Sequence, residues 1–173
     1  ESVEPFAPPG EAGIEPRRER IEMTLGVMHE AMPLFPLMHE MTTDHVHEEI
    51  ALLAVDFSTM FFESIAPGPA WESYYRAHDQ TPHYRFLTLM LKALQFTRGG
   101  ERWLLKSPQH LEQLPVLAEV FPEATVVLTH RDPALVTVSM ATMVAYTARA
   151  YTDTVDAVGL GRAWADRIEA LLS

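Results

Sequence analysis

Two segments in the second half of the chain share one order of features: an apolar run, a cation, a turn with proline, and a helical pattern. The first segment reads WLLKSPQHL and the second reads VVLTHRDPAL. An apolar run that leads directly into a helix is typical of a β-α unit, and consecutive β-α units pair their strands in parallel. The order predicts strands over 102–106 and 125–129, and helices over 108–120 and 133–150. We therefore expect an α/β fold with a parallel sheet flanked by helices.

The first half of the chain is predicted to be mainly helical. Prolines and glycines in residues 1–16 indicate a loop or tail, and helical spacing of apolar residues begins at Arg17 and ends at Pro33 and Pro36. Thr43 and Asp44 suit the N-cap of a second helix, with acidic residues in its first turns. This helix is expected to bury Ile50, Leu53, Ala54 and Phe57.

Further helices are expected around 71–76, after a Pro-Gly-Pro break, and from Thr81 to the two glycines at 99 and 100. A last helix is expected over 155–172, with an apolar face formed by Leu160, Trp164, Ile168 and Leu171.

Composition limits the class of protein. A length of 173 residues with 47% hydrophobic residues suits one domain with a sizeable core. A net charge of -11 argues against binding to nucleic acid or an anionic membrane, because such binding needs many basic side chains. The sequence has no cysteine and no apolar run near the roughly 20 residues that span a bilayer. The simplest location is therefore the cytoplasm.

Each predicted strand ends in a cation, Lys106 in the first and Arg131 in the second. Ligands of parallel sheets bind beyond the carboxyl ends of the strands. Asp132 suits the N-cap of the helix that Pro133 starts, and Arg131 would lie beside the first N–H groups of that helix, which favour anions. Ser139 lies two turns into the helix. Pairing of Arg131 with a carboxylate, and packing of Ser139 between helices, remain the alternatives.

These residues resemble the sulfotransferases that use 3'-phosphoadenosine 5'-phosphosulfate (PAPS), in particular the bacterial group related to tyrosylprotein and carbohydrate enzymes. The resemblance runs from RWLLKSPQHLEQLPVLAEVFPEATVVLTHRDPALVTVSMATMV to GRAWADRIEALL, and covers roughly half of the chain. It implies a P-loop-like sheet and no metal. It also implies that Arg131 and Ser139, eight residues apart, hold the 3'-phosphate of PAPS.

The same resemblance implies a role for the turn after the first predicted strand. Lys106 is similar to a lysine of the tyrosylprotein branch that contacts the sulfuryl group and the leaving phosphate, and Ser107 stands where that branch has aspartate. Ser107 is counted with the residues that bind PAPS. The Gly-rich phosphosulfate loop of the family, Arg-Ser-Gly-Thr-Thr, has no counterpart here. We therefore expect residues 1–173 to be a single sulfotransferase-like domain that lacks this N-terminal loop, in an incomplete chain that shows little or no transfer by itself.

The stretch TTDHVHEEI supplies the candidates for a base that removes a proton from the acceptor. In the tyrosylprotein branch the base is a glutamate of a Glu-Glu pair, which makes Glu49, followed by Glu48, the first choice here. Stabilisation of a helix N-terminus is the alternative role of both. A metal site of Asp44, His45, His47 and Glu48 is the rival interpretation. However, His45 and His47 would diverge by about 200° around a helix.

Two further histidines, His110 and His130, flank the predicted anion site, either as ligands of substrate or water or as structural residues. The predicted activity is transfer of a sulfuryl group to a hydroxyl of a small-molecule, lipid or glycan acceptor. A non-catalytic fragment or interaction module that keeps only a nucleotide-phosphate site is the alternative. A P-loop kinase would need a Walker loop and carboxylates for Mg²⁺, which the sequence does not display. The sequence selects neither the acceptor nor an oligomeric state.

Overall fold

The computed structural model describes residues 11–65 and 68–172, and every regular element in these ranges is a helix. The elements in chain order are α1 (Glu11–Ala31), α2 (Phe35–Met38), α3 (Ile50–Val55), α4 (Phe61–Ile65), α5 (Pro69–Ala77), α6 (Thr81–Arg98), the 3₁₀ helix η1 (Pro108–Glu112), α7 (Leu114–Val120), α8 (Pro133–Ala148) and α9 (Ala157–Leu172). The predicted α/β fold with a P-loop-like parallel sheet is therefore wrong for the described residues.

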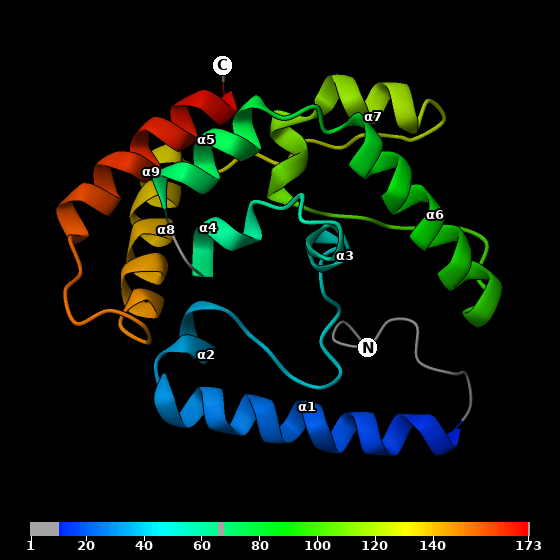
Figure 1. The fold of residues 1–173 in the computed structure, drawn as a ribbon, viewed down its shortest axis with the longest axis horizontal. Helices are drawn as coiled ribbons and strands as arrows, with labels where there is room; N and C mark the ends of the chain where they lie inside the picture. The colour runs from blue at the N-terminus through cyan, green and yellow to red at the C-terminus, as the bar shows by residue number, and fades with distance from the viewer. Residues whose placement is uncertain (1–10, 66–67, 173) are drawn as a thin grey trace.

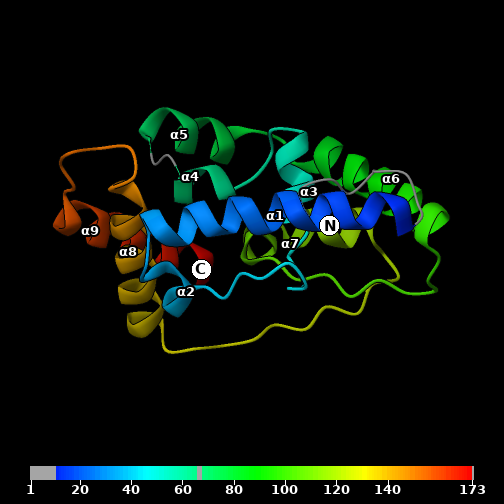
Figure 2. The same cartoon turned by 90° about the horizontal axis from the view of Figure 1, so that it is seen from below.

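The two predicted strands are irregular connections, and no described segment pairs with their backbone. Within the described ranges, neither 102–106 nor 125–129 forms a backbone–backbone hydrogen bond with another segment. Figure 2 shows residues 121–132 as a long connection between α7 and α8. Val126, Val127 and Leu128 are 52%, 77% and 47% exposed. A strand depends on a neighbour for its hydrogen bonds and on a buried face, and the apolar run meets neither condition here.

The helices form two packed groups with shorter elements between them (Figure 1). Helices α8 and α9 pack against each other at one end of the molecule, and α6 and α7 pack at the other. Helices α3, α4 and α5 lie between these groups, and α1 runs along one side. The short α2 contacts α8, where the Leu34 N–H donates to the Tyr146 hydroxyl at 3.0 Å.

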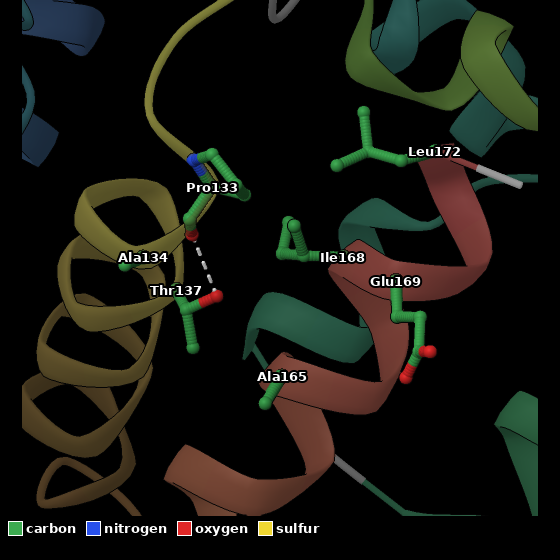
Figure 3. A pocket seen from close by; sticks show the side chains of 7 residues that line it. All are labelled: Pro133, Ala134, Thr137, Ala165, Ile168, Glu169 and Leu172. Carbon is green, nitrogen blue, oxygen red and sulfur yellow. Dashed lines mark hydrogen bonds between the residues drawn. The ribbon is translucent and has the colours of Figure 1, made fainter.

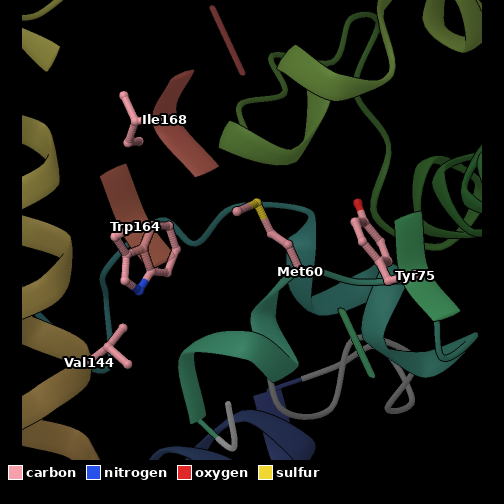
Figure 4. Packing of buried hydrophobic residues seen from close by; sticks show 5 residues of the cluster. All are labelled: Met60, Tyr75, Val144, Trp164 and Ile168. Atoms are coloured by element: carbon pink, nitrogen blue, oxygen red, sulfur yellow. The ribbon is translucent and has the colours of Figure 1, made fainter. Parts of the chain in front are cut away.

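Two separate apolar clusters correspond to the two groups. The first joins α5, α8 and α9 to the segment before α4, and its buried members are Met60, Tyr75, Val144, Trp164 and Ile168 (Figure 4). The predicted amphipathic helix over 155–172 is confirmed as α9, and Trp164 and Ile168 supply its buried face. The second cluster joins α3 to α6 through Leu53, Tyr84, Leu87 and Leu91. Leu105, from the first predicted strand, packs against this second cluster.

The prolines and glycines predict several helix ends correctly. Helix α6 begins at Thr81 and ends before Gly99, which has a φ of 76° that favours glycine. Asp132 caps α8 as predicted, because its Oδ1 accepts from the Ala134 N–H at 2.9 Å and from the Leu135 N–H at 3.4 Å. Residues 11–16, which are predicted to be a loop, instead begin α1, and residues 1–10 lie outside the described ranges.

Helix α3 begins at Ile50, later than predicted, with Glu49 at its N-cap. Asp44 does not cap it. Both oxygens of Asp44 instead accept from the Arg18 guanidinium of α1, at 2.6 and 2.8 Å. Asp44 is thus tied to α1. Glu48 and Glu49 lie at the entry to α3 and not inside its first turns.

The end of α3 explains why Phe57 is exposed and not buried as predicted. Phe57 has a φ of 52° in the left-handed region, and its N–H donates to Ala54 O at 3.1 Å. The Ser58 N–H donates to Leu53 O at 3.2 Å. These two bonds form a Schellman C-cap, which turns the chain before Phe57 completes another helical turn.

Candidate functional site

The fold brings Lys106 together with both members of the Glu-Glu pair, although they are 58 and 57 positions away in the sequence. The Lys106 Nζ forms an ion pair with Glu48 Oε1, and the Lys106 N–H donates to Glu49 Oε2 at 2.8 Å. We call Glu48, Glu49, Lys106 and His110 the lysine–carboxylate cluster. The Lys106 side chain is 75% exposed, so the cluster presents its ammonium group at the surface.

Glu49 is the buried member of the cluster, with a side chain that is 3% exposed. Burial alone would raise the pKa of this carboxyl. Hydrogen bonds from His110, from its own backbone N–H and from the Lys106 N–H outweigh that effect and hold the pKa below its ordinary value. Glu49 is therefore ionised at neutral pH, and both of its oxygens accept hydrogen bonds.

His110 connects the cluster to the core of the protein. Its Nε2 contacts Glu49 Oε1, and its Nδ1 lies 2.8 Å from the Tyr84 hydroxyl. Tyr84 is fully buried on α6, and burial raises the pKa of its hydroxyl far above the ordinary value. His110 is thus a structural histidine. Its hydrogen-bond partners are a carboxylate and a phenol and not a backbone carbonyl. No local pattern in the sequence indicates these partners.

The segment from Lys106 to His110 is fixed by hydrogen bonds at every polar side chain. Ser107 is buried and caps η1, because its Oγ accepts from the Gln109 N–H at 3.3 Å. Gln109 is fully buried, and its amide donates to Ser58 O at 3.1 Å and accepts from the Met60 N–H at 3.0 Å. Gln109 was not among the sequence candidates. It joins η1 to the loop that follows α3 and so positions the turn that carries Lys106.

Arg131 and Ser139 lie apart from the cluster. Arg131 is exposed in the connection before α8, and Ser139 is exposed on α8 itself. No hydrogen bond or ion pair joins either of them to Lys106 in the part of the chain that the structure describes. The first N–H groups of α8 are already occupied by Asp132. Arg131 itself forms no ion pair with a described carboxylate, and its guanidinium stays open to an anion.

A cavity of about 350 Å³ lies between α8 and α9, close to the start of α8 (Figure 3). Its lining is mostly apolar, and its hydroxyl, Thr137 Oγ1, donates to Pro133 O at 2.8 Å. The charged lining residue is Glu169. A negative charge and an apolar wall do not suit a phosphate, so this cavity is not a candidate for the nucleotide.

The metal interpretation receives no structural support. The described residues contain no group of three or more His, Asp or Glu side chains that could hold an ion. His45 and His47 contact each other edge to face, with ring centroids 5.2 Å apart, while Asp44 is engaged by Arg18. Among the described helices, none is long and apolar enough to cross a membrane.

An exposed ammonium group paired with a carboxylate is suited to proton transfer and to stabilisation of a developing negative charge, which is the chemistry of a group-transfer enzyme. A sequence model of the sulfotransferase family matches residues 3–173, which is nearly the whole chain. The chain belongs to the sulfotransferase family, and its general chemistry is the transfer of a sulfuryl group. Comparison with curated proteins and with solved structures finds no match.

Proposed function

We propose that this protein transfers the sulfuryl group of PAPS to a hydroxyl group of a small-molecule, lipid or glycan acceptor. Sulfotransferases generally take the group from this donor, and the family match covers almost the entire chain. The observation that carries the proposal is the ion pair between Lys106 and Glu48 beside the buried Glu49. It supplies a cation for the donor and a carboxylate for the acceptor within one cluster.

The reaction needs both charges. The acceptor oxygen attacks the sulfur of PAPS, the bond between sulfur and the bridging phosphate oxygen breaks, and 3'-phosphoadenosine 5'-phosphate (PAP) leaves with the electron pair. The acceptor proton passes to a carboxylate. Negative charge grows on the bridging oxygen during this step, and the Lys106 ammonium is the group suited to stabilise it. Ser107 supports Lys106 by fixing the turn that carries it.

Glu48 is the carboxylate better suited to accept the proton. A base needs an accessible lone pair, and the Glu48 side chain is partly exposed, with one oxygen paired to Lys106. Glu49 has no such freedom, because His110 and the Lys106 N–H engage both of its oxygens. Glu49 then acts by holding Lys106, and its substitution also affects turnover.

Arg131 and Ser139 are proposed to hold the 3'-phosphate of PAPS. The exposed guanidinium of Arg131 offers a planar pair of donors to phosphate oxygens, and the Ser139 hydroxyl adds one more donor. Their position apart from the cluster also favours a second candidate function. A non-catalytic module with only a nucleotide-phosphate site would need Arg131 and Ser139 but not Lys106.

Transfer of labelled sulfur from PAPS to a panel of phenol, sterol and glycoside acceptors tests the proposal, together with calorimetry of PAP binding. We expect a labelled acceptor with the intact wild-type protein and none above background with the Lys106→Ala variant of the same protein. Binding of PAP without transfer to any acceptor would favour the non-catalytic module. If the protein neither binds PAP nor transfers sulfur, both the sulfotransferase proposal and the non-catalytic module are overturned.

A further inference from the structure

A chain of hydrogen bonds runs from the protein core to the candidate site through three side chains on three elements. Tyr84 of α6 contacts His110 of η1, and His110 contacts Glu49 at the N-cap of α3. Glu49 then accepts from the Lys106 N–H at 2.8 Å. We call these three residues the Tyr84–His110–Glu49 chain.

The protonation states along this chain follow from burial and charge. Burial keeps the Tyr84 hydroxyl protonated, so this group is a donor. The Glu49 carboxylate is ionised and is an acceptor. The ionised carboxylate can only accept, so the His110 Nε2 that faces it carries a proton and donates, while the Tyr84 hydroxyl lies within hydrogen-bond distance of Nδ1. Glu49 thus fixes the proton on Nε2, and Tyr84 holds the opposite side of the ring.

We propose that His110 is a positioning residue for sulfuryl transfer, which acts by clamping Glu49 against the Lys106 backbone. The hydrogen bond from the Lys106 N–H to Glu49 fixes the backbone from which the Lys106 side chain extends, so that Nζ remains beside Glu48. His110 is not itself the base, because Glu49 and Tyr84 occupy both of its nitrogens. This inference rests on the proposed function for its effect on turnover, but its structural part is measurable without any substrate.

Hydrogen exchange of the Lys106 backbone amide, followed by NMR on the whole chain, measures the clamp directly. The wild-type amide should be protected, because its N–H donates a hydrogen bond to the buried carboxylate of Glu49. His110→Ala frees Glu49 to move and should speed exchange at Lys106 by about tenfold to a hundredfold. His110→Gln, whose amide can still donate to Glu49, should keep most of the protection.

Two further variants separate the clamp from general destabilisation. Tyr84→Phe keeps the buried ring and removes the hydroxyl, so it should weaken protection at Lys106 without unfolding the protein. His78→Gln is the matched control. It removes a hydrogen bond between the imidazoles of His78 and His83, 2.7 Å apart at the ends of α5 and α6, and should leave Lys106 exchange unchanged.

Turnover completes the test. In a folded His110→Ala protein, kcat should fall about tenfold or more with little change in the KM for PAPS, and His110→Gln should restore most of it. Unchanged exchange at Lys106 in both His110→Ala and Tyr84→Phe would overturn the clamp. Faster exchange at Lys106 with wild-type kcat would overturn its role in transfer. If no acceptor is ever sulfated, the proposed function fails while the exchange result still decides whether the clamp exists.

Discussion

Arg167 of α9 forms an ion pair with Glu112 of η1 at 2.9 Å, although the Arg167 side chain is only 3% exposed. The same guanidinium lies 3.3 Å from Glu63 of α4. One buried cation therefore serves two carboxylates and joins three elements around the first apolar cluster. Burial, together with the neighbouring carboxylates, raises the pKa of both Glu63 and Glu112, even though Arg167 acts in the opposite direction.

The raised pKa values predict a pH dependence of stability. A carboxyl with a raised pKa in the folded state stabilises the fold fully below its unfolded pKa, near the ordinary value of 4.5, and loses that contribution as pH rises through the folded pKa. Glu63→Gln removes one such group and leaves the Arg167–Glu112 pair. The free energy of unfolding of the wild type, minus that of Glu63→Gln, should fall as pH rises from about 4.5.

Urea unfolding at several pH values measures this difference, and Glu119→Gln, in the exposed pair with Arg85, is the control. A difference that stays constant across the range would contradict the prediction. At pH values where both carboxyls are ionised, Arg167→Ala should be more damaging, at a cost of about 3 to 5 kcal/mol, because it leaves two buried carboxylates without their cation.

Gln109 is predicted to be important for stability. Gln109→Ala would leave Ser58 O and the Met60 N–H without their partner in the interior. Each unsatisfied group costs about 1 to 3 kcal/mol, so the free energy of unfolding should fall by roughly 2 to 6 kcal/mol. Gln95→Ala removes an exposed bond to Gly100 O and is the matched control, with an expected change below about 1 kcal/mol. Equal effects of the two substitutions would show that Gln109 does not hold the loop.

Arg131 is predicted to bind the nucleotide. Arg131→Ala removes a charge-assisted contact of about 1.5 to 3 kcal/mol, so the affinity for PAP should drop by roughly tenfold to a hundredfold. Calorimetry measures the change, with Arg162→Ala, an exposed arginine of α9, as the control. Unchanged affinity in a folded Arg131→Ala protein would reject this assignment.

Lys106 and the two glutamates should differ in their kinetic effects. Lys106→Ala should lower kcat more than it raises the KM for PAPS, because the interaction strengthens as charge develops on the leaving oxygen.

Glu48→Gln should cut turnover by about 10² to 10⁴ with nearly unchanged PAP affinity, since only proton acceptance is lost. Glu49→Gln should also reduce turnover through the position of Lys106. Steady-state rates at wild-type level in both glutamine variants would remove the glutamates from the chemistry.

The helices could be predicted from the sequence, because their signals are local. Asp132 before Pro133, and Thr81 before Pro82, supply cap and first-turn residues within a few positions of each other, and both predicted helices are confirmed. Whether a strand forms could not be predicted from local signals. The run from Val126 to Leu128 has the composition of a buried strand, but a strand exists only where another segment pairs with it, and composition does not contain that partner.

In the candidate site, too, single residues could be predicted from the sequence but the contacts between them could not. The resemblance to known sulfotransferases selected Lys106 and the Glu-Glu pair, and their juxtaposition depends on contacts between residues far apart in the sequence. The partners of His110 are Tyr84 of α6 and Glu49 at the N-cap of α3, which are far from His110 in the sequence. No periodicity or spacing reports such a meeting, so these contacts became visible only in three dimensions.

The exposed stretch from Val126 to Leu128 has a consequence for how the protein behaves at high concentration. Its backbone N–H and C=O groups form no backbone–backbone hydrogen bonds with described residues, and its side chains are apolar and β-branched or long. Such a segment is a ready template for an extended chain from another molecule. Self-association of this protein is therefore expected to begin at the connection between α7 and α8. A charged side chain at Val127 is the change that would suppress it with least disturbance to the helices.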